Sequence, residues 1–195
     1  AGGVGIGTIF LKRGYSLQRT YALSKLESAI MPAIQVGLLV LVVTAPAFIF
    51  FSQKGPGAMH APWLISLAAG LVVGGLSQYS RLCTVGGFRD LFLFKKSVLI
   101  FGYIAVLVGV FAVNISFGNF HLGFENQPVS HTDGLWNFLG MALAGFCSVL
   151  LGGCPLRQLI MTGEGNSDSA VTVLGLAAGA AFAHNFGLAA SGAGP

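Results

Sequence analysis

Long apolar segments, separated by short polar stretches, constrain the fold of this chain more than any other feature. A helix needs roughly 20 apolar residues to cross a bilayer. Four of the five segments are long enough or nearly so, and the one at 135–151 is at the short limit. The pattern predicts an all-α, polytopic membrane protein with about five transmembrane helices. The segments lie at about 30–51, 63–80, 97–117, 135–151 and 169–190.

The composition agrees with a membrane domain. Only 8% of the 195 residues are Asp, Glu, Lys or Arg, whereas 54% are hydrophobic, and soluble domains carry about 25% charged residues. The 29 glycines show no three-residue period, and small residues of this kind let membrane helices approach closely. The net charge of +4 comes from basic residues that lie between apolar segments. We therefore expect the lipid bilayer, and no nucleic acid, as a partner.

The two ends of the chain suggest that it is part of something longer. It opens at Ala1 within an apolar run that reaches Leu11, too short to span a bilayer and without the basic region of a signal peptide. It closes on the small residues 189–195. We interpret residues 1–195 as a single transmembrane domain and as a fragment of a larger transporter.

The basic residues predict an orientation. If all five segments span, nine Lys and Arg share one side and only Lys54 lies on the other. Cytoplasmic loops carry an excess of Lys and Arg, so we expect the nine in the cytoplasm and the loop Gly118 to Gly134, which has none, outside. The nine are Lys12, Arg13, Arg19, Lys25, Arg81, Arg89, Lys95, Lys96 and Arg157.

Two parts of the chain resemble each other, at about 63–96 and 135–165. Each has a Gly-rich apolar segment, a break, a cysteine and a short apolar stretch that carries an arginine. The cysteines are Cys83 and Cys154, and the arginines are Arg89 and Arg157. Paired broken helices in repeated units indicate a transporter's substrate site near the middle of the membrane. A chance likeness between Gly-rich helices is the alternative.

The short apolar stretches after the two cysteines, 88–94 and 156–161, cannot span a membrane. They are nevertheless too apolar for ordinary loops. Irregular backbone at membrane depth is tolerated where it is buried in protein or lines a wet cavity. We therefore expect each stretch to be a short re-entrant helix beside a central pathway.

The residues around Cys154 predict that it begins a helix. Gly152 and Gly153 break the preceding helix, and Pro155 favours the first helical position. Cys154 would then be the N-cap, among unsatisfied N–H groups at the positive end of the helix dipole, where anions bind. Arg157, one turn further on, would add a fixed charge. Each such cysteine could instead be a small buried apolar residue.

Cys83 has a similar setting, because Gly86 and Gly87 follow it at the start of its short stretch. We predict that Cys83 and Cys154 face each other across the centre of the molecule. Cys147 lies within an apolar segment, two turns before Cys154, and fits a buried structural residue as well as a third pathway thiol. The candidate pathway residues are therefore Cys83, Cys154, Arg157, Arg89 and Cys147.

Other kinds of site have little support in the sequence. No C-x-x-C motif, metal-ligand cluster or phosphate-binding loop is present, so we expect no metal, no cofactor and no enzyme activity. A membrane thiol oxidoreductase stays open as an alternative if two thiols lie close enough to bridge, for which Cys147 and Cys154 are candidates. A passive anion channel is a second alternative.

The polar turn 163–168 begins the last apolar segment. Ser167 or Asp168 is the predicted N-cap there. Glu164 and Asn166, in the same turn, could contact a partner or act as a gate. None of these residues carries a motif of its own.

Two motifs resemble the YeeE/YedE membrane transporter family. They are Ser80-Arg-Leu-Cys83-Thr-Val-Gly-Gly-Phe-Arg89-Asp-Leu-Phe and Gly152-Gly-Cys154-Pro-Leu-Arg157-Gln-Leu-Ile. The second continues into Gly163-Glu-Gly-Asn-Ser-Asp168, and the run Ala183-His-Asn-Phe-Gly187 looks most like the branch of YedE-related selenium metabolism proteins. The likeness covers about residues 60–190.

The resemblance implies a carrier of the bacterial inner membrane with inverted repeats and an hourglass-like helical shape. It also implies a sulfur- or selenium-containing anion as substrate, thiosulfate being the characterised type, and leaves room for a cytoplasmic sulfur or selenium carrier protein as partner. Cys83 and Cys154 match the cysteines thought to pass the anion by thiol hydrogen bonds, whereas Cys147 has no motif position. Family members are about twice as long as this chain.

Overall fold

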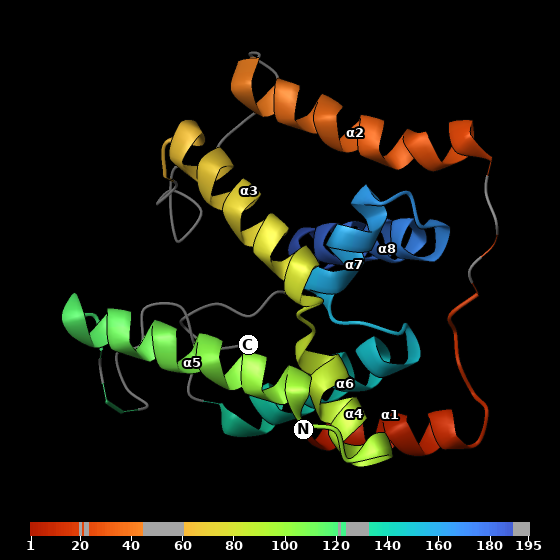
Figure 1. The fold of residues 1–195 in the computed structure, drawn as a ribbon, viewed down its shortest axis with the longest axis vertical. Coiled ribbons are helices and arrows are strands. Elements are labelled where there is room, and N and C mark those ends of the chain that lie inside the picture. Colours follow the sequence, from red (N-terminus) through yellow and green to blue (C-terminus); the bar gives the residue numbers. More distant parts are fainter. Residues whose placement is uncertain (20, 22–23, 45–60, 121, 124–132, 189–195) are drawn as a thin grey trace.

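The structure is a computed structural model that describes all residues except 20, 22–23, 45–60, 121, 124–132 and 189–195. Helices make up nearly all of the ordered elements in the described part (Figure 1). In chain order they are α1 (Gly2–Lys12), α2 (Lys25–Thr44), α3 (Trp63–Ser80), α4 (Thr84–Phe94), α5 (Val98–Ser116), α6 (Gly134–Leu150), α7 (Pro155–Gly163) and α8 (Ser167–Asn185).

The predicted class, an all-α polytopic membrane protein, is confirmed. Within the described residues, four stretches are long and apolar enough to cross a membrane: Lys25–Thr44, Trp63–Phe94, Val98–Ser116 and Gly134–Gly163. The sequence predicted about five, and α8 is the one that is not among the four. The polar residues in its first and last turns lower the mean hydropathy of this helix.

The first long helix begins earlier than its apolar segment, which starts near residue 30. The N–H of Ser24 donates to the Glu27 carboxylate at 2.9 Å, and the N–H of Glu27 donates to the Ser24 hydroxyl at 3.3 Å. This reciprocal pair is a capping box, which satisfies N–H groups that a helix start leaves free. The cap lets α2 begin at Lys25, ahead of the apolar run. The end of that run falls at 45–51, outside the described residues.

The same order of elements occurs twice along the chain. A long helix (α3) leads through Cys83 to a short helix (α4) and a long helix (α5), and α6, Cys154, α7 and α8 follow the same order. The short helices cover the stretches where the sequence predicts re-entrant segments. Each short helix packs against the long helix that follows it, α4 on α5 and α7 on α8. Figure 1 shows α2 across one end of the molecule, with α1, α4, α5 and α6 towards the other.

Small residues allow α1 to lie directly against α6. A Cβ atom on Gly3 would lie 1.8 Å from the carbonyl oxygen of Ala142, and one on Gly7 would lie 2.9 Å from the Cβ of Val149. Val4 and Val149 are buried at this contact. Close backbone approach through glycine is the usual way in which membrane helices associate. This contact fixes the position of α6, the helix that leads to Cys154.

The predicted orientation stays a prediction. Lys54 and most of the loop Gly118 to Gly134 lie outside the described residues. Among the described residues, α2 and α5 contain no buried residue. Such apolar surfaces suit contact with lipid or with further transmembrane helices.

Candidate substrate site at the paired cysteines

Each of the two motif cysteines is the N-cap of a short helix, as predicted. Cys83 has an extended backbone before α4, and its sulfur accepts a hydrogen bond from the N–H of Gly86 at 3.2 Å. Cys154 has an extended backbone before α7, with Pro155 in the first turn. The thiols therefore lie among the N–H groups that the first turn of a helix leaves without helical partners.

The structure brings the two cysteines together, although 71 residues separate them. The N–H of Cys154 donates to the sulfur of Cys83 at 3.4 Å. Both residues are buried, with exposed fractions of 7% for Cys83 and 4% for Cys154. The starts of α4 and α7 thus converge on one point. Since the N-terminus of each helix carries a partial positive charge, this point favours a negatively charged atom.

Glycines beside the first cysteine make this convergence possible. A Cβ on Gly86 would lie 3.2 Å from the sulfur of Cys83, and one on Gly87 would lie 3.1 Å from the backbone nitrogen of Ile100. Larger residues would therefore push α4 away from its thiol and from α5. The two glycines that marked this region as a helix start also provide its close packing.

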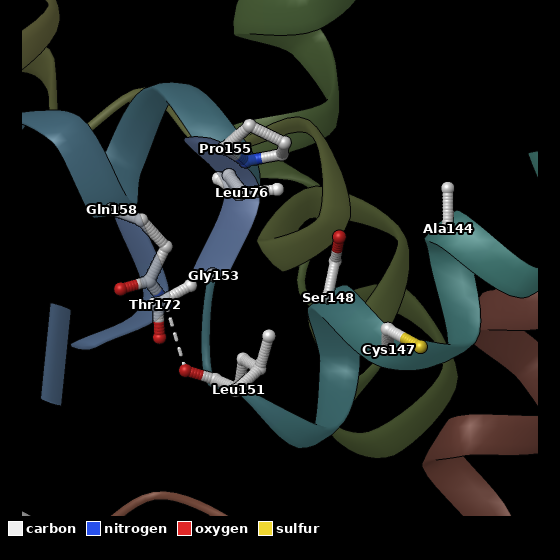
Figure 2. A pocket seen from close by; sticks show the side chains of 9 residues that line it. All are labelled: Ala144, Cys147, Ser148, Leu151, Gly153, Pro155, Gln158, Thr172 and Leu176. Carbon is white, nitrogen blue, oxygen red and sulfur yellow. Dashed lines mark hydrogen bonds between the residues drawn. The ribbon is translucent and has the colours of Figure 1, made fainter. Parts of the chain in front are cut away.

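The second cysteine is held by a turn and by a buried amide. Gly152 has a φ of +80°, a left-handed conformation that favours glycine and ends α6. The Nε2 of Gln158 donates to the carbonyl oxygen of Leu151 at 2.8 Å, as Figure 2 shows. Gln158 is 3% exposed. Its hydrogen bond links the residue three positions before Cys154 to the residue four positions after it. The sequence alone assigned Gln158 no role.

Arg157 lies near Cys154 on α7, and its partner comes from another helix. Its Nη1 donates to the Oε1 of Gln78 at 2.7 Å. The Nε2 of Gln78 in turn donates to the carboxylate of Glu164. Gln78 lies in the last turn of α3. Sequence analysis missed it, and the available signal was an amide in an otherwise apolar helix.

Arg89 differs from Arg157 in its electrostatic surroundings. Its Nη2 lies 2.9 Å from the carboxylate of Asp90, and its Nε donates to the same oxygen. A neighbouring residue therefore balances its charge. Among the residues that the structure describes, Arg157 takes part in no ion pair. Of the two arginines that follow the motif cysteines, Arg157 is the one whose charge is available near a cysteine.

Cys147 differs from the two motif cysteines in its exposure. It is in α6 and is the exposed thiol of the three. It lines a cavity of about 120 Å³ between α6, α7 and α8, together with Ser148 and Pro155 (Figure 2). The contact between cysteines that the structure shows is the hydrogen bond from the N–H of Cys154 to the sulfur of Cys83, and the pairing of Cys147 with Cys154 considered for an oxidoreductase stays a prediction.

The polar turn before α8 corrects one prediction. The N-cap is Asn166, whose Oδ1 accepts from the N–H of Ser169 at 3.0 Å, and not Ser167 or Asp168. The helix therefore starts one residue earlier than expected. The carboxylate of Asp168 instead accepts a hydrogen bond from the N–H of Arg19. These contacts give Asn166 and Asp168 structural roles.

The comparison with protein families decides the assignment. A model described as "Sulphur transport" matches residues 79–191, more than half of the chain. This chain belongs to the Sulphur transport family. The family is the YeeE/YedE family that the two cysteine motifs resemble. The matched region contains Cys83, Cys154 and Arg157, and it begins directly after Gln78.

One relative in this family has a named activity. The thiosulfate transporter TsuA of Escherichia coli (strain K12) is 27% identical to the chain over 115 residues. The alignment covers 55% of this chain and 30% of the transporter, so the chain corresponds to less than a third of that relative's length. No solved structure matches the chain.

Proposed function

We propose that this protein carries a sulfur- or selenium-containing inorganic anion across the bacterial inner membrane, along a pathway that includes Cys83, Cys154 and Arg157. Membership of the Sulphur transport family supports transport of a sulfur compound, and the thiosulfate transporter of E. coli, as a relative, supports thiosulfate. The observation that carries the proposal is the meeting of two buried cysteines at the starts of two helices. A selenium anion rests on the motif resemblance alone.

An oxyanion inside a membrane is costly unless protein dipoles replace its water. The starts of α4 and α7 would supply N–H groups and the positive ends of two dipoles to one point. Arg157, near this point, would supply a full charge. No covalent step is needed, because hydrogen bonds from the thiols suffice to hold the anion in passing.

The thiols would also give selectivity. An S–H group is a weak donor with a soft sulfur atom, which suits the terminal sulfur or selenium of a substrate better than a hard sulfate oxygen. Cys83 and Cys154 are the buried pair, so we place them on the pathway. Cys147 and Arg89 are left out of it, because the first is exposed and the second is paired with Asp90. A cytoplasmic sulfur or selenium carrier protein as partner stays a prediction.

A membrane thiol oxidoreductase is the second candidate, and the adjacency of two buried thiols favours it. Forming a disulfide between Cys83 and Cys154 would release two protons and two electrons, which a membrane quinone would have to accept. Anion uptake that continues in Cys83→Ser and in Cys154→Ser, together with thiol-dependent quinone reduction, would favour this candidate over transport.

Uptake by the full-length protein tests the proposal. Proteoliposomes would be offered radiolabelled thiosulfate, selenite and sulfate, with and without a membrane potential, and the unmodified protein should favour thiosulfate, which has a terminal sulfur, over sulfate. Cys154→Ser retains a hydroxyl donor but loses the soft thiol, and should impair uptake. Cys147→Ser is the matched control, because it makes the same change at the exposed thiol.

Arg157 is tested in the same assay. Arg157→Gln keeps a polar side chain and removes the charge, so uptake should collapse while membrane insertion survives. If Arg157 only anchors its helix at the membrane surface, where long basic side chains extend towards water, both Arg157→Lys and Arg157→Gln should transport normally. Normal uptake by Arg157→Gln and Cys154→Ser, at matched expression, would show that these residues are not on the transport pathway.

A further inference from the structure

The side-chain amide of Gln78 lies between two opposite charges, Arg157 in α7 and Glu164 directly after the end of α7. Its oxygen accepts from the guanidinium of Arg157 at 2.7 Å, and its NH₂ group donates to the carboxylate of Glu164. Figure 1 shows the end of α3, which carries Gln78, beside α7. The two hydrogen bonds also fix which atom of the amide is oxygen, because only the oxygen can accept from a guanidinium.

Arg157 and Glu164 would otherwise be able to pair with each other. They are seven residues apart in the region of α7, which is about two helical turns, so both side chains leave the same side of the helix. Two turns rise about 10 Å, a gap that an extended arginine and an extended glutamate can bridge together. Within the described part of the chain they form no ion pair, and the Gln78 amide separates them.

A neutral partner leaves the charge of the arginine uncompensated. The guanidinium has five N–H donors in a planar fork, and the bond to Gln78 is made by Nη1. Other donors therefore remain for an anion. A carboxylate in place of Gln78 would cancel the charge, as Asp90 does for Arg89.

We propose that Gln78 is a positioning residue, which keeps Arg157 available to the transported anion by holding Glu164 away from it. The inference rests on the proposed function, since it assumes that Arg157 meets an anion. It adds a residue on α3, outside both cysteine motifs and outside the matched family region. It also gives Glu164 a defined effect, as the competitor of the substrate for Arg157.

The KM of thiosulfate uptake by the full-length protein in proteoliposomes tests this inference. In Gln78→Ala, Glu164 can reach Arg157, and the KM should rise about tenfold, the change expected when a charge-assisted hydrogen bond to the anion is lost. Adding Glu164→Gln to this variant removes the competing carboxylate and should restore the KM of the unmodified protein. Asn114→Ala, which removes an amide from α5, is the control and should leave the KM unchanged.

The outcomes separate a positioning role from a structural one. An unchanged KM in Gln78→Ala would overturn the inference. A raised KM that Glu164→Gln does not reverse would overturn it too, because removing the carboxylate charge does not repair a loss of packing. Absence of uptake of both thiosulfate and selenite by the unmodified protein would instead overturn the proposed function. Gln78→Glu gives a second reading, since it should raise the KM even where Gln78→Ala is poorly inserted.

Discussion

Substitution of Gly3 by alanine is the most direct test of the helix contact that supports the cysteine site. The added Cβ would lie 1.8 Å from the carbonyl oxygen and 2.9 Å from the Cα of Ala142 in α6. Both atoms belong to the backbone, so no side-chain rotation can relieve the overlap. Restoring a contact of 3.0 Å requires α1 and α6 to separate by about 1.2 Å.

The free-energy cost of Gly3→Ala can be compared with that of Gly5→Ala, the same change in the same helix. Overpacking of a close contact costs typically about 1–3 kcal/mol, and we expect the upper end because backbone meets backbone. Gly5 lies in the same helix, and a Cβ there would meet nothing within 4 Å. Gly5→Ala should therefore be neutral or gain up to about 1 kcal/mol from helix propensity.

Thermal unfolding of the detergent-purified full-length protein measures both variants. Gly3→Ala should lower the Tm by ~6 °C or more, and Gly5→Ala should leave it unchanged or raise it. Uptake should fall in Gly3→Ala as well, because α6 leads directly to Cys154. Equal Tm values for the two variants would show that α1 does not pack on α6 in this way, and the reasoning from the Gly3 contact would then be wrong.

Two further predictions concern strain and orientation. Lys95 ends α4 with a φ of 52°, a left-handed conformation that is strained for a lysine. Lys95→Gly should therefore raise the free energy of unfolding by about 0.5–1 kcal/mol, measured by chemical denaturation. A lower free energy of unfolding in this variant would contradict the strain. A cysteine introduced at Asn126, in the predicted outside loop, should react with an impermeant maleimide in intact spheroplasts. Labelling there only after lysis would reverse the orientation.

The starts of the short helices could be predicted from the sequence, because the interactions that define them are local. Gly152, Gly153 and Pro155 lie within three residues of Cys154, and each acts on the backbone next to it. The capping box of Ser24 and Glu27 is equally local, yet it precedes the apolar run and was passed over. The N-cap Asn166 was missed by one residue, since three adjacent polar residues can all cap a helix.

The sequence by itself determined the helical membrane class, the two breaks at the cysteines and the family. Bilayer thickness requires apolar segments of a given length, and the end of a helix requires particular residue types nearby, so both can be recognised in short stretches of sequence. The tertiary structure decided which distant groups meet: the sulfur of Cys83 with the N–H of Cys154, and Arg157 with Gln78, 79 residues away. The physical reason is that such contacts depend on how close two helices approach, and small residues such as Gly3, which meets Ala142, set that approach through atoms far along the chain.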